Sequence, residues 1–375
     1  MPRQVQPSKR GTVRPFTVDD IEQVADLSWR TLHRRCDPAP PWLRSYFEQL
    51  YFHNPWREDA PPSLAYEDLN GRLVGFLGVI PRRMTLKGTT IRVACGSTLV
   101  VEPSRRCTLA GLRLIQAFLS GSQDLSLTDS ANDVTQRLWT GLGGSTGFLN
   151  SIYWSRPLRP TAYGLYMVSR LKASTFTRFL ASVARPLSKA VDPLAARMPG
   201  PFRYLNCGLI AEELDARTLL GCLSEFLDGQ PLRAQNDQAS LAWLLDFMSS
   251  TKGHGDLRKL LLLDTQGDVV GWYVYFRRRG GVAEVAQIGA RRNGMGQVLD
   301  HLFWDAWNCG ALAVHGQLDP MHAEDLRERC YFFYRRGSWL LVHSRDPELQ
   351  QYVLSGNASL TRLDGEWCLG FDVDN

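Results

Sequence analysis

Residues 125–143, LSLTDSANDVTQRLWTGLG, change from one periodicity to another within a few positions. The first part alternates apolar and polar residues, which is typical of a β-strand with one buried face. The second part places Leu138 and Trp139 at helical spacing, six and seven residues after Asn132, and it ends at Gly143. Asparagine is a preferred residue at a helix start, and glycine at a helix end. The stretch therefore predicts a strand, a polar corner and a helix in immediate succession.

The composition is that of a globular protein with more than one domain. The chain has 375 residues, of which 44% are hydrophobic and 22% are charged. At roughly 150 residues a domain, this length favours two domains. The sequence holds no apolar run near the roughly 20 residues that span a bilayer, and its polar, basic N-terminus lacks the apolar core of a secretory signal. We therefore expect no stable membrane insertion and a cytoplasmic location.

The eight cysteines are scattered and form no CxxC pair, and no His/Cys spacing is typical of a zinc site. Reduced thiols and no bound metal are the natural expectation for such a chain.

Strand and helix signals follow one another in the same order in both halves of the sequence. Residues 12–150 predict a strand, a helix, three strands, a loop, a helix, a strand and a helix, with hairpin turns at Asn70-Gly71 and Lys87-Gly88. The second half predicts helices at 216–228 and 238–250, a hairpin around Gln266-Gly267, a strand, loop and helix within 281–307, and strands in ALAVHGQL, SWLLVHS and GEWCLGF.

This order predicts an α/β (α+β) protein of two tandem domains, at residues 1–155 and 206–375. Each domain is expected to hold a mixed, mostly antiparallel sheet flanked by helices. Residues 156–205 form a partly helical linker between them.

The linker carries an excess of positive charge, although the net charge of the chain is only +5. Asp192 is its one acidic residue between positions 156 and 203. The linker either contacts an anionic partner or is a solvated face of linker helices. The basic residues are Arg156, Arg159, Arg170, Lys172, Arg178, Arg185, Lys189, Arg197 and Arg203.

Two motifs within residues 12–150 resemble those of the GNAT acyltransferase superfamily. The first is LVVEPSRRCTLAGLRLIQAFL, where Pro103, Arg106 and Gly111 match a strand end followed by an R/Q-x-x-G-x-G/A loop, and Leu109 stands at the first glycine position. The second is the opening stretch, which matches N-x-x-A-x-x-L-Y-x-x-x-G-F at Asn132, Leu138 and Gly143, with Thr135 for Ala, Trp139 for Tyr and Gly144 for Phe. The resemblance implies tandem GNAT-like domains.

The resemblance also implies an acyl-coenzyme A co-substrate, either acetyl-coenzyme A or a longer acyl-coenzyme A. Successive backbone N–H groups at a helix start hold a pyrophosphate, and the strand before them splays from its neighbour and exposes its backbone to the pantetheine arm. Asn132 either caps its helix or touches that arm. The donor-binding residues implied are Leu99, Val100, Val101, Arg106, Cys107, Thr108, Leu109, Ala110, Gly111 and Asn132.

Three catalytic candidates follow from the same resemblance. Asp129 and Glu102 are candidate general bases, with Glu284 as their counterpart in the second half, and each is also interpretable as a solvated carboxylate or a helix cap. Trp139 stands where the family often has a tyrosine that protonates the leaving thiolate. An indole N–H donates a hydrogen bond but no proton at neutral pH. Either coenzyme A leaves as a thiolate, or another residue protonates it, or this half is not catalytic.

The resulting hypothesis is an N-acyltransferase that moves an acyl group from a thioester to an amine of a small molecule or peptide. An acyl carrier protein is an alternative donor, because the basic linker suits an acidic partner. A non-catalytic binding module is a second hypothesis. In a third, the Arg291–Gly296 loop, which satisfies R-x-x-G-x-G, holds the donor. No nucleic-acid-reading motif occurs, and the acceptor, the acyl chain length and the oligomeric state stay open.

Overall fold

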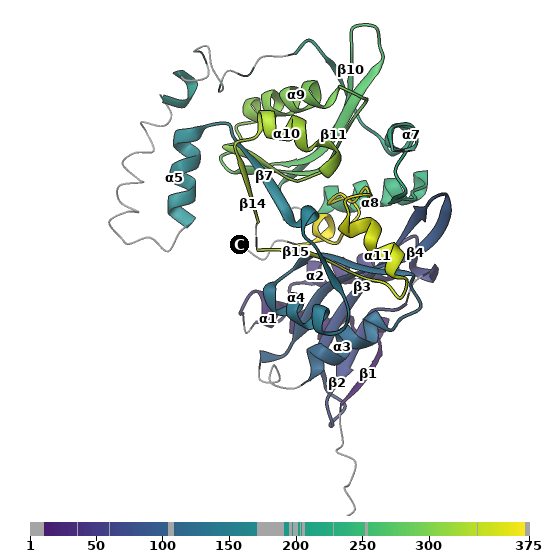
Figure 1. The fold of residues 1–375 in the computed structure, drawn as a ribbon. Coiled ribbons are helices and arrows are strands. Elements are labelled where there is room, and N and C mark those ends of the chain that lie inside the picture. The colour runs from purple at the N-terminus through teal and green to yellow at the C-terminus, as the bar shows by residue number, and fades with distance from the viewer. Residues whose placement is uncertain are drawn as a thin grey trace, which may run out of the picture.

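Two mixed β-sheets with helices around them make up the described part of the chain. The computed structural model describes residues 11–35, 37–59, 61–103, 109–170, 191–194, 197, 202, 204, 207–227, 229–251, 254–335 and 337–371. Figure 1 shows the two sheets stacked, with the first half of the chain below and the second half above. The fold class predicted from the sequence is confirmed.

The first sheet is antiparallel except where β4 and β5 run parallel. Its strands, in order across the sheet, are β1 (Thr12–Pro15), β2 (Leu64–Glu67), β3 (Leu73–Leu86), β4 (Thr89–Val101), β5 (Leu125–Ala131), β15 (Trp339–His343) and β6 (Ser145–Gly147), and β9 (Leu232–Ala234) pairs with the C-terminal end of β3.

The second sheet has the same plan, with one parallel pair, β12 and β13, among antiparallel neighbours. Its strands, in order, are β14 (Phe332–Arg335), β7 (Ile152–Pro157), β13 (Ala313–Gln317), β12 (Val282–Ala290), β11 (Val269–Arg277), β10 (Asp256–Leu263) and β8 (Ile210–Glu213).

The two halves of the chain exchange one strand each. β7 comes from the first half and lies in the second sheet between β14 and β13. β15 comes from the second half and lies in the first sheet between β5 and β6. Figure 1 shows this yellow strand beside the blue strands of the first half. Each half therefore completes the sheet of the other. The domain boundaries at residues 155 and 206 stay a prediction, and the exchange crosses them.

Helices cover both sheets, and the largest apolar core lies between them. That core joins α1 (Ile21–Leu32) and α2 (Pro41–Phe52) of the first half to α7 (Ala216–Phe226) and α8 (Gln238–Ser250) of the second. The outer face of the first sheet packs on α3 (Ala110–Leu119) and α4 (Asp133–Gly141). The outer face of the second packs on α9 (Met295–Asn308) and α10 (Ala323–Arg329).

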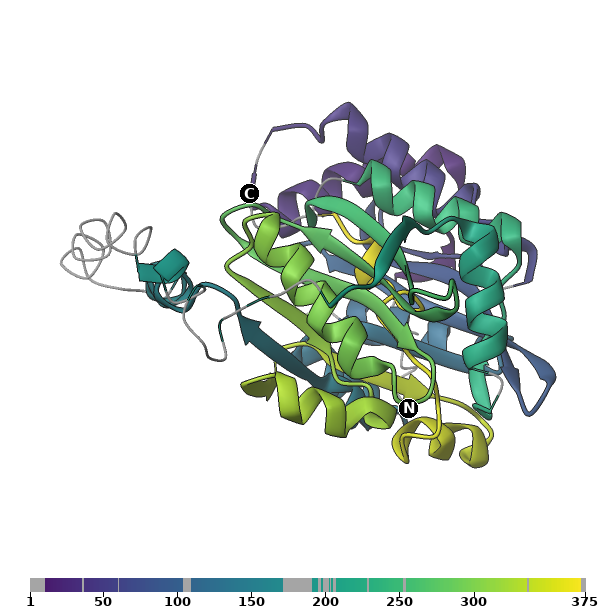
Figure 2. The same ribbon diagram turned by 90° about the horizontal axis from the view of Figure 1, so that it is seen from above.

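One helix stands away from this body. Figures 1 and 2 both show α5 (Pro160–Arg170) projecting to one side of the molecule. Its N-terminal end is held by Asp192, whose carboxylate accepts hydrogen bonds from the backbone N–H groups of Thr161 and Ala162, each at 3.0 Å. Within the described ranges, no helix is both long and apolar enough to cross a membrane.

Local chemistry explains the elements that the sequence predicts well. The Asn132 side chain accepts hydrogen bonds from the N–H groups of Val134 (3.0 Å) and Thr135 (2.9 Å), so it caps α4. Lys87 and Gly88 have φ angles of 49° and 85°, the left-handed values that a tight hairpin requires between β3 and β4. The predicted strand, corner and helix of residues 125–143 are thus β5, Asn132 and α4.

The last predicted strand, GEWCLGF, is wrong: residues 367–369 form the 3₁₀ helix η7 (Trp367–Leu369). We call residues 358–371 the terminal segment. It passes between the two halves. At its start, Ser359 N donates to Leu232 O of β9 (2.8 Å). Further on, side chains bond its backbone: Tyr46 Oη donates to Leu369 O (2.7 Å) and Arg82 Nε to Asp364 O (3.3 Å). The other short helices are η1 (Val18–Asp20), η2 (Arg57–Asp59), η4 (Leu149–Ser151), η6 (Pro320–His322) and α11 (Pro347–Leu354).

Candidate active site

The first sheet opens where its parallel pair ends. The register between β4 and β5 stops at Cys95 and Leu127, and beyond it β4 runs on to Val101 and β5 to Ala131 without pairing with each other. We call this gap, between residues 96–101 and 128–131, the first opening. Backbone N–H and C=O groups at an unpaired strand edge are free to bond an extended ligand.

A β-bulge lies at the mouth of the first opening. The register of β3 on β4 shifts between Phe76 and Gly78, which gives β4 one extra residue there. Thr98 lies in the bulge with a φ of 47°, which a β-branched residue rarely adopts. The Tyr51 hydroxyl of α2 donates to Thr98 Oγ1 (3.2 Å) and hydrogen-bonds Ser97 Oγ (2.9 Å). Bulges leave residues unpaired and strained positions cluster at functional sites, so this point is a candidate contact for substrate.

The terminal segment places a carboxylate in the first opening. Burial alone raises the pKa of a carboxyl group, but at Glu366 hydrogen bonds outweigh it and the pKa lies below its ordinary value. Glu366 is therefore ionised at neutral pH, and its lone pairs are occupied. The donors are Cys95 Sγ (3.0 Å), Asp129 N (2.9 Å), Ser130 N (3.1 Å), Ser130 Oγ (2.6 Å) and Thr128 Oγ1.

Asp129 holds the same segment from the other side. Its Oδ1 accepts hydrogen bonds from the N–H groups of Glu366 (3.1 Å) and Trp367 (3.0 Å). Burial raises the pKa of Asp129 well above its ordinary range, and the negative charge of Glu366 raises it further. Of the two carboxyl groups, Asp129 therefore binds a proton more readily than Glu366.

The second sheet opens in the same way and receives a cation. The register between β12 and β13 ends at Glu284 and His315, and we call the gap beyond it the second opening. Arg362 Nη1, in the terminal segment, donates to Glu284 Oε2 (2.8 Å) and Val285 O (3.4 Å). The Arg362 side chain is 1% exposed, and its guanidinium lies 3.9 Å from the Trp367 ring centre. Such a cation needs the Glu284 charge, because a buried unpaired charge is costly.

His315 extends this network with groups able to move a proton. Its Nδ1 lies 3.0 Å from the Tyr334 hydroxyl, and its Nε2 lies 3.0 Å from the Tyr163 hydroxyl of α5. The Glu284 carboxylate is 3.7 Å from Nδ1. A neutral imidazole has one donor and one acceptor nitrogen, so its two nitrogens can pass a proton between hydroxyl partners. The side chain is 7% exposed, so this exchange is sheltered from water.

One cavity brings the two openings together. Its volume is about 670 Å³, within the range of small-molecule sites. Thr98 and Glu366 line it from the first opening, and Glu284, His315 and Arg362 from the second. We call it the interdomain cavity. The interdomain cavity is therefore lined by the bulge residue Thr98, the carboxylates of Glu284 and Glu366, and the buried imidazole of His315. Sequence periodicity alone does not show that these groups lie together.

A separate cavity of about 490 Å³ lies at the Arg291–Gly296 loop, which was predicted as an alternative donor site. The loop leads into α9, whose cap residue Gly294 gives no side-chain hydrogen bond. Thr361 lines this cavity, while the next residue, Arg362, lines the interdomain cavity. The terminal segment therefore stands between the two cavities.

The predicted catalytic residues lie in different surroundings. Asp129 is buried beside the terminal segment, and Glu102 is paired with Arg72 (2.6 Å) at the end of β4. Trp139 is 2% exposed in the core of the first sheet, and its Nε1 donates to Val342 O (3.0 Å). None of the three lines the interdomain cavity, whereas Glu284, their predicted counterpart, does.

The predicted donor-binding residues are described in part. Arg106, Cys107 and Thr108 lie outside the described residues. Leu99, Val100 and Val101 form the end of β4 along the first opening, and Asn132 caps α4. Leu109, 58% exposed, precedes α3, and Ala110 and Gly111 begin the helix.

These described residues fit a thioester donor at two points. The edge of β4 beyond Cys95 is not paired with β5, and the helix start at Leu109 has no side-chain cap that would compete with an anion. Among the described residues, a Cβ at Gly111 would meet Val101 alone, at 3.7 Å, so these residues leave space for a close approach to the backbone there.

Of the basic linker, the structure describes residues 156–170, 191–194, 197, 202 and 204. Arg156 and Arg159 do not form an open charged face: Arg156 donates to Arg329 O (2.7 Å), and Arg159 to Ala311 O (2.6 Å) and Trp307 O (2.8 Å). Lys172, Arg178, Arg185, Lys189 and Arg203 lie outside the described residues.

Sequence reasoning missed His315, Arg362 and Glu366. A usable signal existed at Glu284, a lone charge in the apolar strand VAEVAQIGA, because such a residue needs a buried partner. No local pattern identifies Arg362 as that partner. In the part of the chain that the structure describes, no three His, Cys, Asp or Glu side chains converge as a metal site requires.

Known structures share this fold at low sequence identity. No protein-family model and no curated protein matches the sequence. A conserved protein from Enterococcus faecalis V583, described as a probable N-acyltransferase, is 11% identical with a TM-score of 0.57, over 91% of this chain and 74% of that one. A GCN5-related N-acetyltransferase from Anabaena variabilis is 13% identical with a TM-score of 0.54, over 88% and 72%.

A third structure comes from a eukaryote. The N-myristoyltransferase of Saccharomyces cerevisiae, solved with bound myristoyl-CoA and inhibitors, is 10% identical with a TM-score of 0.52, over 91% of this chain and 81% of that one. The chain therefore has the GNAT fold in tandem, as the motifs implied.

Proposed function

We propose that this chain is an N-acyltransferase, which moves an acyl group from an acyl-coenzyme A thioester to an amine by direct transfer. One observation carries the proposal. The opening between β4 and β5, with the bulge at Thr98, faces the same cavity as the sheltered pair of His315 and Glu284. Fold likeness alone does not fix an activity, but proteins with this fold include one solved with myristoyl-CoA.

The first opening is the proposed donor site. The pantetheine arm runs along the unpaired edge of residues 99–101, and the phosphates lie at the start of α3, where Gly111 leaves room. The thioester carbonyl then lies at the Thr98 bulge. A backbone N–H exposed by the bulge stabilises the oxyanion that forms when the amine attacks.

The interdomain cavity is the proposed acceptor site, with His315 as the proton acceptor. The amine nitrogen attacks the thioester carbon, the nitrogen loses a proton to His315 directly or through the Tyr334 hydroxyl, and Glu284 stabilises the imidazolium. The carbon–sulfur bond then breaks. Coenzyme A leaves as a thiolate, which an ordinary thiol pKa near 8.5 permits without a protein acid. This removes the need for an acid at Trp139.

Glu366 is not the proposed base. Its lowered pKa and its many hydrogen-bond donors make it a weak proton acceptor. Its proposed role is to hold the terminal segment across the first opening, and with it Arg362.

The experiment measures release of free coenzyme A by chromatography, using the purified full chain, acetyl- to palmitoyl-coenzyme A and a panel of amines and peptides. We expect turnover with at least one pair. His315→Gln should lower kcat about 100-fold or more, the usual contribution of a general base. His53→Gln is the matched control, because His53 is exposed and lines none of the cavities described above.

No binding and no turnover with any donor would refute the proposal for coenzyme A thioesters. Turnover that His315→Gln does not lower would support the acyl-transfer activity but refute His315 as the general base. Binding without turnover would favour the second candidate, a non-catalytic binding module, for which the burial of Trp139 at the expected acid position is the supporting observation. An acyl carrier protein is tested as donor in the same assay.

A further inference from the structure

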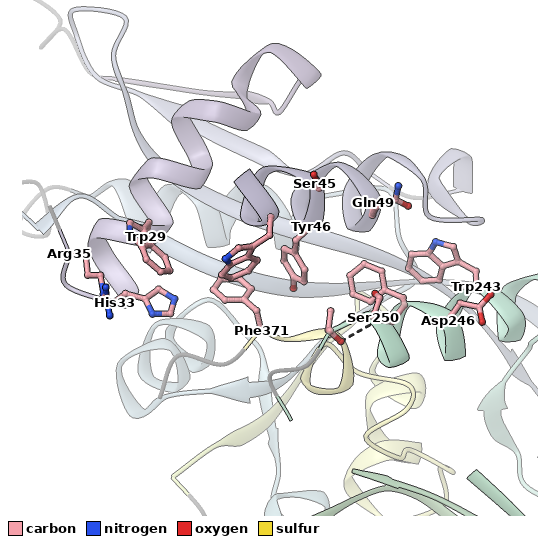
Figure 3. Close-up of a pocket in the computed structure, with 13 residues that line it drawn as sticks. Trp29, His33, Arg35, Ser45, Tyr46, Gln49, Trp243, Asp246, Ser250 and Phe371 are labelled. Carbon is pink, nitrogen blue, oxygen red and sulfur yellow. Dashed lines mark hydrogen bonds between the residues drawn. The ribbon is translucent and has the colours of Figure 1, made fainter. Parts of the chain in front are cut away.

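A large aromatic groove lies between the first and second halves, beside the interdomain cavity. Its volume is about 1040 Å³, at the top of the usual range for small-molecule sites. Trp29 of α1, Trp42 of α2, Trp243 and Phe247 of α8 and Phe371 of the terminal segment line it. Figure 3 shows Trp29 toward one end, Trp243 toward the other and Phe371 between them. We call it the aromatic groove.

Helical spacing directs these side chains to the groove. Trp42, Tyr46 and Gln49 on α2 are separated by four and three residues, which places them on one face of the helix. Trp243, Phe247 and Ser250 on α8 follow the same spacing. Trp42 remains 50% exposed, so a large ring lines the groove without being buried by the protein itself.

The aromatic groove adjoins the interdomain cavity. Tyr46 and Phe371 line both spaces, and Thr98 of the bulge lines the interdomain cavity. The Tyr46 hydroxyl is not available to a ligand at this boundary, because it donates to Leu369 O (2.7 Å). The boundary between the two spaces is therefore aromatic ring surface.

Helix α2 extends from the bulge to the groove. Tyr51 hydrogen-bonds Thr98 at the bulge, and Tyr46 and Trp42, four residues apart on another face of the helix, line the groove. At 1.5 Å per residue, the nine positions from Tyr51 to Trp42 extend about 13 Å along the helix. An acetyl group at the bulge would not reach the groove, whereas a long chain would.

The charges of the groove lie at its ends. Figure 3 shows Arg35 and His33 at one end and Asp246 at the other, with aromatic rings between them. Arg35 and Asp246 are both exposed. The middle of the groove suits an aliphatic chain, which gains free energy by leaving water.

We propose that the aromatic groove holds the aliphatic chain of a long-chain acyl donor whose thioester lies at the Thr98 bulge. This assignment rests on the proposed acyl transfer, and it specifies long-chain acyl thioesters as the class of donor. The acceptor amine is not the expected occupant, because its proposed base, His315, lies on the side of the second opening.

The first experiment measures chain binding directly. Bromine on a palmitic acid chain quenches nearby tryptophans, and Trp29, Trp42 and Trp243 line the groove. We compare the full-length wild type with Ser250→Phe, which narrows the groove, and with Ser249→Phe. The two serines are a matched pair: both are exposed, and each hydroxyl bonds a carbonyl of its own helix, Phe247 O (2.7 Å) for Ser250 and Leu245 O (2.8 Å) for Ser249. Only Ser250 lines the groove.

We expect saturable quenching in the wild type and in Ser249→Phe, and at least tenfold weaker binding in Ser250→Phe. Palmitoyl-coenzyme A should displace the brominated acid, and acetyl-coenzyme A should not. Absence of saturable quenching, or equal affinity in the two variants, overturns the assignment.

The second experiment measures transfer. Ser250→Phe should raise KM for palmitoyl-coenzyme A and leave that for acetyl-coenzyme A unchanged. A raised KM for the amine with unchanged chain-length preference would overturn the proposal and assign the groove to the acceptor. Acetyl transfer without chain binding would refute the groove assignment alone, whereas chain binding without any transfer would refute the proposed function alone.

Discussion

The first and second openings are built alike and filled differently. In both sheets a parallel pair ends early, and the longer strand of that pair carries a bulge just beyond: Thr98 lies in the bulge of β4, and Ala286 in that of β12. Thr98 has a left-handed φ and lines the interdomain cavity. Ala286 is buried in the central core. The bulge residue thus faces the interdomain cavity in the first half and packs in the apolar core in the second.

The two openings also differ in the charge that the terminal segment places in them. It places the anion Glu366 in the first opening and the cation Arg362, four residues earlier, in the second. In the first opening, backbone N–H and hydroxyl groups donate hydrogen bonds to the Glu366 carboxylate. In the second, the Glu284 carboxylate pairs with the Arg362 guanidinium. The comparison teaches that two openings of the same design can hold one chain segment through opposite charges, an anion in the first and a cation in the second.

The largest effect is expected at the second opening. Arg362→Met leaves Glu284 buried without its cation, which should lower the free energy of unfolding by about 4 kcal/mol. Urea denaturation at neutral pH measures it. Adding Glu284→Gln should restore part of the loss. Arg327→Met removes an exposed pair with Glu324 and should cost about 0.5 kcal/mol or less. A loss for Arg362→Met no larger than this control would contradict the described pairing.

A smaller loss is expected at the first opening. Glu366→Gln replaces one acceptor oxygen by an amide N–H₂ that faces donors, which should lower the free energy of unfolding by about 2 kcal/mol. The same denaturation measures it, with Glu348→Gln, on the exposed surface, as the control. If Glu366→Gln lowers the free energy of unfolding by more than Arg362→Met does, the larger stabilising contribution assigned to the second opening is wrong.

A third test asks which opening binds the donor. Leucine at Gly111 puts its Cβ in ordinary van der Waals contact with Val101, at 3.7 Å, and should leave folding unchanged while weakening coenzyme A binding at least tenfold, about 1.4 kcal/mol. A Cβ at Gly296 would lie 2.3 Å from Arg329 Nη2, so Gly296→Leu displaces a side chain of the second half and should leave that affinity unchanged. Calorimetric titration with coenzyme A measures both. The reverse result would assign the donor to the Arg291–Gly296 loop.

The smallest effect concerns pH. The raised pKa of Asp129 means that proton binding favours the folded chain: this contribution is complete below the unfolded pKa, near 3.9, and is lost as pH rises through the folded pKa. Asp129→Asn keeps the acceptor for the Glu366 and Trp367 N–H groups and does not titrate. The variant should therefore gain stability over the wild type as pH rises from the unfolded pKa through the folded pKa. A difference that stays constant with pH, in denaturation at several pH values, would show that Asp129 is not the protonated partner.

Local patterns predicted most of the elements because their causes are local. Asn132 caps the helix that follows it, and Lys87-Gly88 makes the turn that its φ angles require. The fold class followed from the order of these elements. GEWCLGF failed because its backbone bonds to side chains of distant residues, such as Tyr46 and Asp129, which periodicity does not register.

The candidate site was less predictable than the fold. The motif positions located the first opening, through residues 99–101, and Glu284 was among the candidate bases. His315, Arg362 and Glu366 come together only through the packing of the two halves. The tyrosine position of the motif is occupied by Trp139, whose indole serves the core through Val342 O rather than a ligand.

The exchanged strands set the order in which this chain completes its fold on the ribosome. β5 and β6 are separated in the first sheet by β15, so the edge of β5 stays open until residues 339–343 have been made. The nascent chain thus carries an unpaired, largely apolar strand edge through most of its synthesis, the kind of edge that attracts wrong partners. Translation speed over the second half, rather than the stability of the first, then sets how long that edge is exposed.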